Sequence, residues 1–165
     1  MPPWRTRREL PRPPFTSYAA KFVCGLQATD ADVVRGIYAT AINIHNPQAT
    51  IAVPFFKKAV IALPERSSTR GQISPFRTET LKPDEAFEVD CTDIRSLFPG
   101  VALPKHIEGF VVMEVPAPAN GGQPPLLDVI GKYSVRHTNT TGTDTTISDA
   151  NGVDVVVYSG KSITQ

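Results

Sequence analysis

The sequence predicts an all-β fold: a single antiparallel β-sandwich of the immunoglobulin or jelly-roll type, with about seven to nine strands, one short helical turn and extended termini. Three observations favour this class. Short runs of alternating apolar and polar residues recur along the chain, as in half-buried antiparallel strands. Turn residues separate these runs at the spacing typical of a sandwich. The chain also lacks strand-helix-strand alternation and any repeat of fixed period.

The length and composition favour one domain. The chain has 165 residues, of which 41% are hydrophobic, so it can form one core but is short for two domains. It contains no apolar run of transmembrane length and no apolar segment typical of a signal peptide, so we expect a soluble chain. The sequence does not determine the cellular compartment, because a signal peptide can have been removed. The net charge of +1 argues against a nucleic-acid surface.

The first segment, residues 1–17, is rich in proline and arginine. Its prolines remove backbone donors and favour an extended polyproline II chain. The segment is either a flexible tail or an arm that lies on a neighbouring subunit, with aromatic anchors and with arginines that face acidic groups. The candidate arm residues are Trp4, Arg5, Arg7, Arg8, Arg12 and Phe15.

The predicted domain, residues 18–137, begins with a strand over residues 18–26 that places Phe22 and Cys24 on one face. Residues 36–63 contain two β-rich runs joined at a turn over residues 46–48, and we expect them to form a central hairpin. In the first run, Ile42 and Ile44 share a face.

The second run of this hairpin contains Pro54. Proline cannot donate to a strand ladder, so this run is expected at a sheet edge or bulged near Pro54. Lys57 and Lys58 fit an edge position, because lysines there discourage edge-to-edge association. A polar loop, residues 64–72, follows.

Residues 73–91 predict a second hairpin. Pro83 lies in its turn, residues 82–85, where it sets the φ angle of a type I turn. Phe87, Val89 and Cys91 then alternate on one face of a strand. Residues 92–98 have a capping residue, helically spaced apolar positions and a Pro-Gly stop, which predicts one helical turn over the end of the core.

Two further strands, residues 109–115 and 126–137, are expected to pair across a Pro- and Gly-rich loop at residues 116–125. The last segment, residues 138–165, is predicted to be a Thr-rich linker and a C-terminal hairpin extension, because Asn-Gly at 151–152 precedes a strand-like run. Together these faces predict one buried core. Its expected members are Ile42, Ile44, Phe87, Val89, Phe110, Val112, Val129 and Tyr133.

No catalytic or metal-binding constellation is found. The histidines, His45, His106 and His137, lie in separate segments without the close spacing of metal ligands. Cys24 is the one nucleophile worth weighing, but apolar neighbours raise rather than lower the pKa of a thiol. The acidic residues between 84 and 108 lack the spacing of a calcium loop. We therefore expect no enzyme activity, no cofactor and no metal.

The two cysteines, Cys24 and Cys91, both fall on predicted inward faces. They are therefore either two buried thiols or one disulfide. The sequence leaves these alternatives open because the compartment is unknown.

A resemblance to a known group covers residues 36–135. A strand with an Asn-Pro turn is followed by a strand with Lys-Lys, a Leu-Lys-Pro-Asp-Glu-Ala turn, the run Phe-Glu-Val-Asp-Cys-Thr-Asp-Ile and the run Glu-Gly-Phe-Val-Val-Met-Glu-Val. This order resembles the layout of sensory rhodopsin transducer-like β-sandwich proteins. The resemblance implies a small β-sandwich that assembles as an oligomer and acts through binding. It implies no site residue.

Two function classes remain. The favoured one is a non-enzymatic structural or interaction subunit that self-assembles into a homo-oligomer or filament, with the terminal segments on its neighbours. The alternative is a module whose end loops, residues 64–72 and 116–125, bind a small molecule, a glycan or a partner protein.

Overall fold

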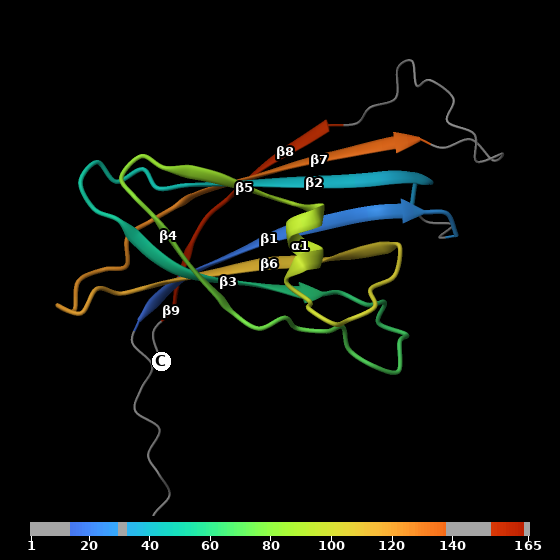
Figure 1. The fold of residues 1–165 in the computed structure, drawn as a ribbon, viewed down its shortest axis with the longest axis horizontal. Helices are drawn as coiled ribbons and strands as arrows, with labels where there is room; N and C mark the ends of the chain where they lie inside the picture. Colours follow the sequence, from blue (N-terminus) through green and yellow to red (C-terminus); the bar gives the residue numbers. More distant parts are fainter. Residues whose placement is uncertain (1–13, 30–32, 138–152, 164–165) are drawn as a thin grey trace, which may run out of the picture.

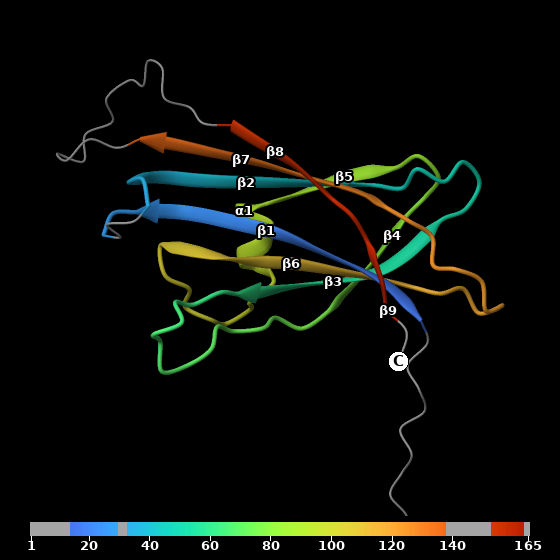
Figure 2. The same cartoon turned by 180° about the vertical axis from the view of Figure 1, so that it is seen from behind.

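The structure is a computed structural model that describes residues 14–29, 33–137 and 153–163. These residues form an all-β antiparallel fold with one short helix (Figure 1 and Figure 2). The strands are β1 (Phe15–Gln27), β2 (Gly36–His45), β3 (Val53–Ile61), β4 (Arg77–Leu81), β5 (Ala86–Asp90), β6 (His106–Pro116), β7 (Asp128–His137), β8 (Val153–Tyr158) and β9 (Lys161–Ile163), and the helix is α1 (Cys91–Ser96).

The strands form one sheet that curls almost into a barrel, rather than the clear two-layer sandwich that we expected. The hydrogen-bonded order is β4-β3-β6-β1-β2-β7-β8, with β5 also on β2 and β9 also on β1. Strand β1 pairs with β2 only at its last residues, Gly25 to Gln27, and with β9 only at its first, Phe15 to Ser17. Because β9 continues from β8, both ends of β1 are tied to the same opposite half of the sheet.

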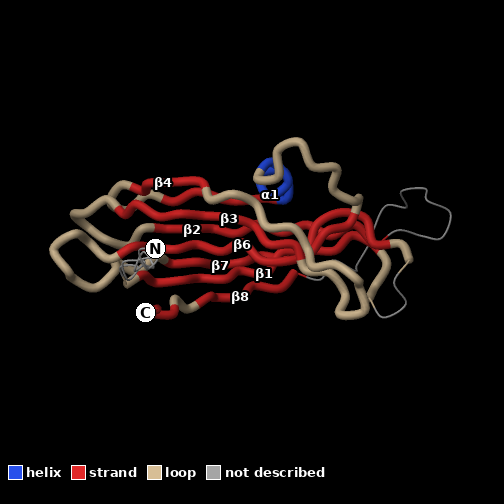
Figure 3. Tube along the Cα trace, turned by 90° about the horizontal axis from the view of Figure 1, so that it is seen from below, coloured by secondary structure: helices blue, strands red, loops and turns tan. Residues whose placement is uncertain are grey.

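The sheet can therefore be divided into two halves. The first half contains β1, β3, β4, β6 and β9, and the second contains β2, β5, β7 and β8. Beyond Tyr38, β2 leaves β1 and takes β5 as its neighbour instead, from Ala41 to His45. The core lies between the two halves. Helix α1 and the loop after it lie to one side of the strands (Figure 3).

Strand β1 forms where the alternation predicts it. Tyr18, Ala20, Phe22 and Cys24 are all buried. The strand begins at Phe15, so residues 15–17 belong to the sheet and not to the expected arm. Likewise β8 and β9 pair with β7 and β1, so the described part of residues 138–165 belongs to the body and is not a separate extension. The predicted Asn-Gly turn lies outside the described residues.

The three hairpins expected between sequence neighbours are wrong, although their strands exist. Strand β3 pairs with β4 and β6 and does not pair with β2. Strand β4 pairs with β3 while β5 pairs with β2, and β6 pairs with β1 and β3 while β7 pairs with β2 and β8. At each of these three connections the chain crosses from one half of the sheet to the other.

Buried Asn46 shows why the chain crosses after β2 instead of turning back. Its side-chain amide donates to the carbonyls of Ile51, Leu81 and Lys82, at 2.9 to 3.1 Å, and its side-chain oxygen accepts from the Gln48 amide. These bonds hold the segment after β2 against the turn between β4 and β5. A buried amide with this many partners stabilises a crossing that carries no ladder of its own.

Strand β3 is not an edge strand, despite Pro54. The pairing of β3 with β6 begins only at Phe56, while Pro54 lies opposite Thr80 of β4. Pro54 therefore lies beyond the stretch in which β3 has a partner on its β6 side. The missing N–H costs no ladder bond there, which is the physical condition under which a strand tolerates proline.

The predicted helical turn is confirmed and starts one residue earlier, at Cys91. Asp90 caps it by accepting from the amides of Thr92 and Asp93, and the Asp93 side chain accepts from the Asp90 amide. This reciprocal pair is a capping box. Ile94 in the helix, with Leu97 and Phe98 just after it, is buried in the core.

The core prediction is half right. Ile42, Ile44, Val89 and Val129 are buried, and Phe87 is partly buried against them. In β6 the expected phase is reversed. Phe110 is 41% exposed and Val112 shares its face, whereas Ile107, Val111, Met113 and Val115 point inward. Tyr133 is only partly buried. The β6 run is apolar on both faces, so its alternation carries no signal for which face is inside.

Candidate functional site

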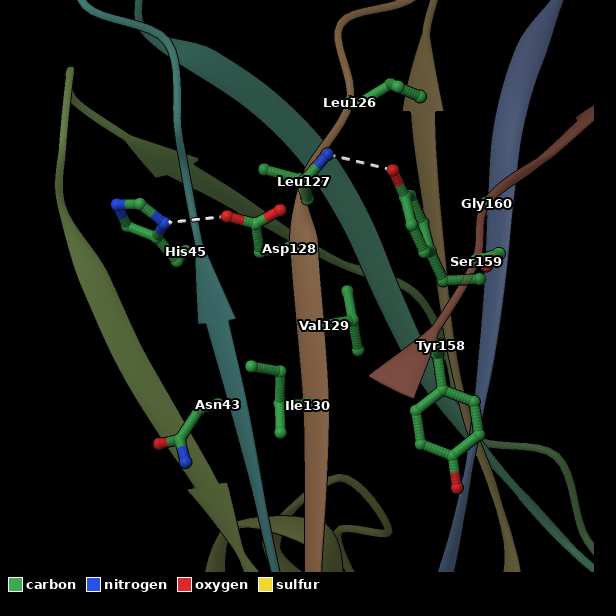
Figure 4. A pocket seen from close by; sticks show the side chains of 11 residues that line it. Asn43, His45, Leu126, Leu127, Asp128, Val129, Ile130, Tyr158, Ser159 and Gly160 are labelled. Carbon is green, nitrogen blue, oxygen red and sulfur yellow. Dashed lines mark hydrogen bonds and ion pairs between the residues drawn. The ribbon is translucent and has the colours of Figure 1, made fainter. Parts of the chain in front are cut away.

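A pocket opens at one end of the body, beside the start of β7 (Figure 4). Its volume is about 460 Å³. The wall is largely apolar, with Leu126 58% exposed and Ile130 37% exposed. Its lining residues are Tyr18, Asn43, His45, Leu126, Leu127, Asp128, Val129, Ile130, Tyr158, Ser159 and Gly160.

His45 lies at the rim of this pocket between two carboxylates. It is the last residue of β2, and the pairing of β2 with β7 places it opposite Asp128, the first residue of β7. Its Nδ1 lies 3.0 Å from Asp128 Oδ2, and its Nε2 lies 3.0 Å from Asp84 Oδ1 in the turn between β4 and β5. The ring therefore joins three segments that are far apart in the sequence. We call His45, Asp84 and Asp128 the histidine clasp.

The carboxylates favour the charged ring. The hydrogen bond to Asp128 and then the hydrogen bond to Asp84 raise the pKa of His45 above its ordinary value of 6.5. Desolvation of the ring lowers the pKa, but by less than either of these hydrogen bonds raises it. An imidazolium is thus the form that the clasp selects.

Tyr18 forms the floor of the pocket. It is 2% exposed, and its hydroxyl oxygen accepts from the Leu127 amide at 2.8 Å. Burial raises the pKa of this phenol. The link from β8 to β9 passes over its ring at Gly160, where a Cβ would lie 2.7 Å from the Tyr18 ring. Glycine is therefore required for the link to close this side of the pocket.

Two tyrosines continue the pocket wall toward β1. The Tyr133 hydroxyl donates to the Lys21 carbonyl at 2.6 Å, and the Lys21 amide donates to the Tyr158 hydroxyl at 3.0 Å. The two hydroxyls also bond to each other. These bonds join the two halves of the sheet where β1 and β7 have no ladder between them.

A second cavity, of about 360 Å³, lies near the other end of β1. Ala62, Leu63 and Pro64 line it, so it borders the loop at residues 64–72. Lys21 and Glu108 form an ion pair of 2.9 Å at its side, and His106 packs edge-on against Tyr38. The Nδ1 atom of His106 is buried without a hydrogen-bond partner among the described residues.

The outer surface of β3 and β6 carries a strip of exposed aromatic residues. Phe56 contacts Phe76 at 6.2 Å between ring centroids, and Lys58 Nζ lies 4.3 Å from the centre of the Phe76 ring. Val60 lies opposite Phe110 in the register of β3 and β6. We call this strip the outer aromatic face. Its members are Phe56, Lys58, Val60, Ile73, Phe76, Phe110 and Val112.

Of the two alternatives that the sequence left open for the cysteines, the structure contains the disulfide. Cys24 and Cys91 form a disulfide with a Cα–Cα distance of 5.6 Å. The bond joins β1 in one half of the sheet to the first residue of α1, which follows β5 in the other half. Cys24 is fully buried. Its sulfur is therefore a structural link and not an accessible thiol.

Most of the expected arm, including Trp4, Arg5, Arg7, Arg8 and Arg12, lies outside the described residues. Of the candidate arm residues the structure places only Phe15, opposite Pro116 in the pairing of β1 and β6. The histidine clasp could not be predicted from the sequence, because Asp84 and Asp128 are separated from His45 by 39 and 83 residues. No spacing pattern links such residues.

The described residues contain no group of three or more His, Cys, Asp and Glu side chains arranged to hold a metal ion. Within the same part of the chain, no helix is long and apolar enough to cross a membrane. Comparison of the chain with models of protein families, with curated proteins and with solved structures finds no match.

Proposed function

We propose that the protein is a non-enzymatic structural or interaction subunit that assembles with copies of itself through the outer aromatic face. The observation that carries this proposal is the exposure of three phenylalanines on neighbouring segments. Phe56 is 38% exposed, Phe76 is 37% exposed and Phe110 is 41% exposed. Single exposed apolar residues are ordinary, but aromatic and aliphatic side chains gathered on one face of a sheet favour a binding surface.

A second copy is the partner that the charges of this face favour. Lys58 lies within the strip, and the Lys21 and Glu108 pair lies at its border with β1. A two-fold contact brings each patch against itself, so a patch that carries both signs can place lysine opposite glutamate. The aromatic rings supply the apolar area that such a contact buries, at about 25 cal/mol per Å².

The sheet also offers edges for assembly. The strand order ends at β4 and β8, and neither has a second partner strand among the described residues. Edge strands can accept a strand from another chain. The N-terminal arm and the edges are secondary contacts in this proposal. The resemblance to sensory rhodopsin transducer-like proteins, which implies an oligomer acting through binding, agrees with it.

The test is the mass of the full chain in solution, measured by light scattering after size separation. We expect an oligomer that Phe110→Asp or Phe76→Asp dissociates, because a carboxylate cannot be buried against a second aromatic strip without a large desolvation cost. Val101→Asp is the matched control, since Val101 is 37% exposed and lies outside the face. A monomeric full chain, or an oligomer unaffected by both changes, would refute the proposal.

The arm is tested by the same measurement. Deletion of residues 1–13 leaves β1 intact, because the strand begins at Phe15. If the arm lies on a neighbour, the truncated chain should keep its circular dichroism spectrum and dissociate at a higher concentration than the full chain. Equal dissociation of both chains would reduce the arm to a tail.

A ligand-binding module is the second candidate, and the pocket beside the histidine clasp is the observation that favours it. Phenol is a suitable probe, because the wall combines apolar and aromatic side chains with the Tyr18 hydroxyl. Chemical-shift changes confined to the pocket, and abolished by Leu126→Asp, would support this candidate over assembly. Changes spread over the outer aromatic face would not.

A further inference from the structure

The histidine clasp lies where the ladders that β2 forms with β5 and β7 both end, and it joins the β4–β5 turn to the start of β7, two segments that no ladder pairs with each other. His45 ends β2, Asp128 begins β7, and Asp84 lies in the turn between β4 and β5. That turn keeps two backbone bonds to Asn46, from the Asp84 amide to the Asn46 carbonyl and from the Asn46 amide to the Glu85 carbonyl. The turn is therefore anchored without the clasp. The segment before β7, which forms the pocket wall at Leu126 and Leu127, is tied to the body by the bond from the Leu127 amide to the Tyr18 hydroxyl and by the last rung of the β2–β7 ladder, at Asp128.

The geometry determines how many protons the ring carries. An ionised carboxylate only accepts hydrogen bonds, so each nitrogen of His45 must donate to the carboxylate that it faces. Only the imidazolium has two N–H groups. A neutral ring has one, and its remaining nitrogen would direct a lone pair at a carboxylate oxygen 3.0 Å away. That contact is repulsive, so the clasp as built exists only in the charged form.

The surrounding charges do not replace this requirement. In the turn, Lys82 Nζ lies 3.7 Å from Glu85, and the Lys82 amide donates to the same side chain. Glu88 of β5 lies opposite Asn43, on the face of the sheet that carries His45. Tyr18 of β1 is buried below Asp128, and its pKa is raised. None of these groups is a cation within bonding distance of Asp128, so among the residues that the structure describes His45 alone bridges the two aspartates.

We propose that the histidine clasp is a proton-controlled latch on the pocket: the charged ring holds the start of β7 against the β4–β5 turn, and loss of its proton releases the Leu126–Asp128 wall. The latch is independent of the proposed self-assembly, because the outer aromatic face shares no residue with the clasp or with the Leu126–Asp128 wall. Loss of the proton also changes the summed charge of the three clasp side chains from −1 to −2. The open pocket thus disfavours anionic ligands.

The direction of the pH dependence follows from the raised pKa of His45. The folded chain holds this proton more tightly than the unfolded chain, whose histidine has its ordinary pKa of about 6.5. The stabilisation from the clasp is therefore complete below about pH 6.5 and is lost as the pH rises through the raised pKa. The latch is closed in mild acid and opens toward alkaline pH.

The experiment is a pH titration of the full chain by nuclear magnetic resonance, following the ring nitrogens of His45 and the exchange of the Leu127 amide. At about pH 6 both ring nitrogens should carry protons. The midpoint of the His45 titration should lie above that of an ordinary histidine. As the pH rises through that midpoint, hydrogen exchange of the Leu127 amide should accelerate by more than the intrinsic exchange rate does, because the amide loses its protection. The Val23 amide, which donates to the Thr40 hydroxyl, is the control and should follow the intrinsic rate only.

Two variants make the proposal falsifiable. Asp128→Asn should lower the midpoint of His45 more than Asp84→Asn does, because Asp128 contributes most to the shift. Asp84 has a φ of 60° and an 89% exposed side chain, so asparagine suits its conformation and this variant should fold. His45→Gln should remove the pH dependence of Leu127 protection. A His45 ring with one N–H at about pH 6, or Leu127 protection that follows the intrinsic rate in the unaltered chain, would overturn the latch.

Discussion

At the scale of single residues, the two faces of β2 have different roles: the inward residues are buried in the core, and the last residue, on the outward face, forms hydrogen bonds at the pocket rim. Ile42 and Ile44 point inward and are fully buried, whereas His45, next in the chain, points outward to the two aspartates. One strand therefore contributes to the core and to the pocket rim by its alternation alone. The register between β2 and β7 places Asp128 opposite His45.

Truncation of Ile44 to Ala should lower the free energy of unfolding by about 2 to 5 kcal/mol, through lost transfer energy and the cavity left behind. Ile44 is fully buried and lies opposite Phe87 on one side and Val129 on the other. Ile51→Ala is the matched control. Ile51 is 48% exposed and lies outside the outer aromatic face, so loss of its side chain should change stability by no more than about 0.5 kcal/mol. Urea unfolding of the two variants measures the difference, and equal losses would contradict the assignment of the inward face.

At the scale of elements, α1 illustrates how a short helix is positioned. Six residues are too few to be helical by propensity alone, so the helix depends on its cap and on buried Ile94. Arg95 adds to this by donating to the carbonyls of Pro104 and Lys105. These bonds hold the long loop after α1 against the end of β1, where Gly25 adopts a φ of 95° and a Cβ would lie 1.8 Å from the Lys105 carbonyl oxygen.

Replacing the cap by Asp90→Ala should lower stability by about 0.5 to 2 kcal/mol, because the amides of Thr92 and Asp93 lose their acceptor. Thr92→Ala is the control, since Thr92 is exposed and its side chain has no capping role in the box. Thermal unfolding followed by circular dichroism gives both values. A cap variant as stable as the control would show that α1 is held by packing alone.

At the scale of the whole molecule, the two halves of the sheet are joined by a few separate ties. The three-residue pairing of β1 with β2 closes one side, and β9 closes the other. The disulfide between Cys24 and Cys91 joins the halves through the core. The last tie is covalent and so persists in partly unfolded states, where the short ladders are lost. Such bonds are stable in oxidising compartments.

Reduction of the disulfide, or the double change Cys24→Ala and Cys91→Ala, should therefore lower the free energy of unfolding by about 2 to 5 kcal/mol. The bond spans 67 residues of sequence, and its removal frees the unfolded chain from that closed loop. Urea unfolding with and without a reductant measures the effect. The double variant is the control, because the chain has only two cysteines and the reductant should leave the variant unchanged. An unchanged free energy of unfolding after reduction would mean that the disulfide does not restrict the conformations of the unfolded chain.

The chain sequence by itself determined the local structure of this protein. The period-2 alternation located most of the strands, and the helically spaced apolar positions and Pro-Gly stop of residues 92–98 located α1, although its cap, Asp90, lies outside that range. The inward phase of Cys24 and Cys91 left a disulfide as one of two alternatives. Each of these features depends on residues that are close in sequence, so it can be predicted from the sequence alone.

Only the tertiary structure decided which strands pair and where a site forms. The connections β2–β3, β4–β5 and β6–β7 each cross between halves of the sheet, because partners such as Asn46 and Leu81 meet across many residues of sequence. The inward face of β6 was ambiguous because both its faces are apolar. The histidine clasp arises in the same way: alternation placed His45 on the outward face of β2, but the register with β7 and the position of the β4–β5 turn supplied its two carboxylates.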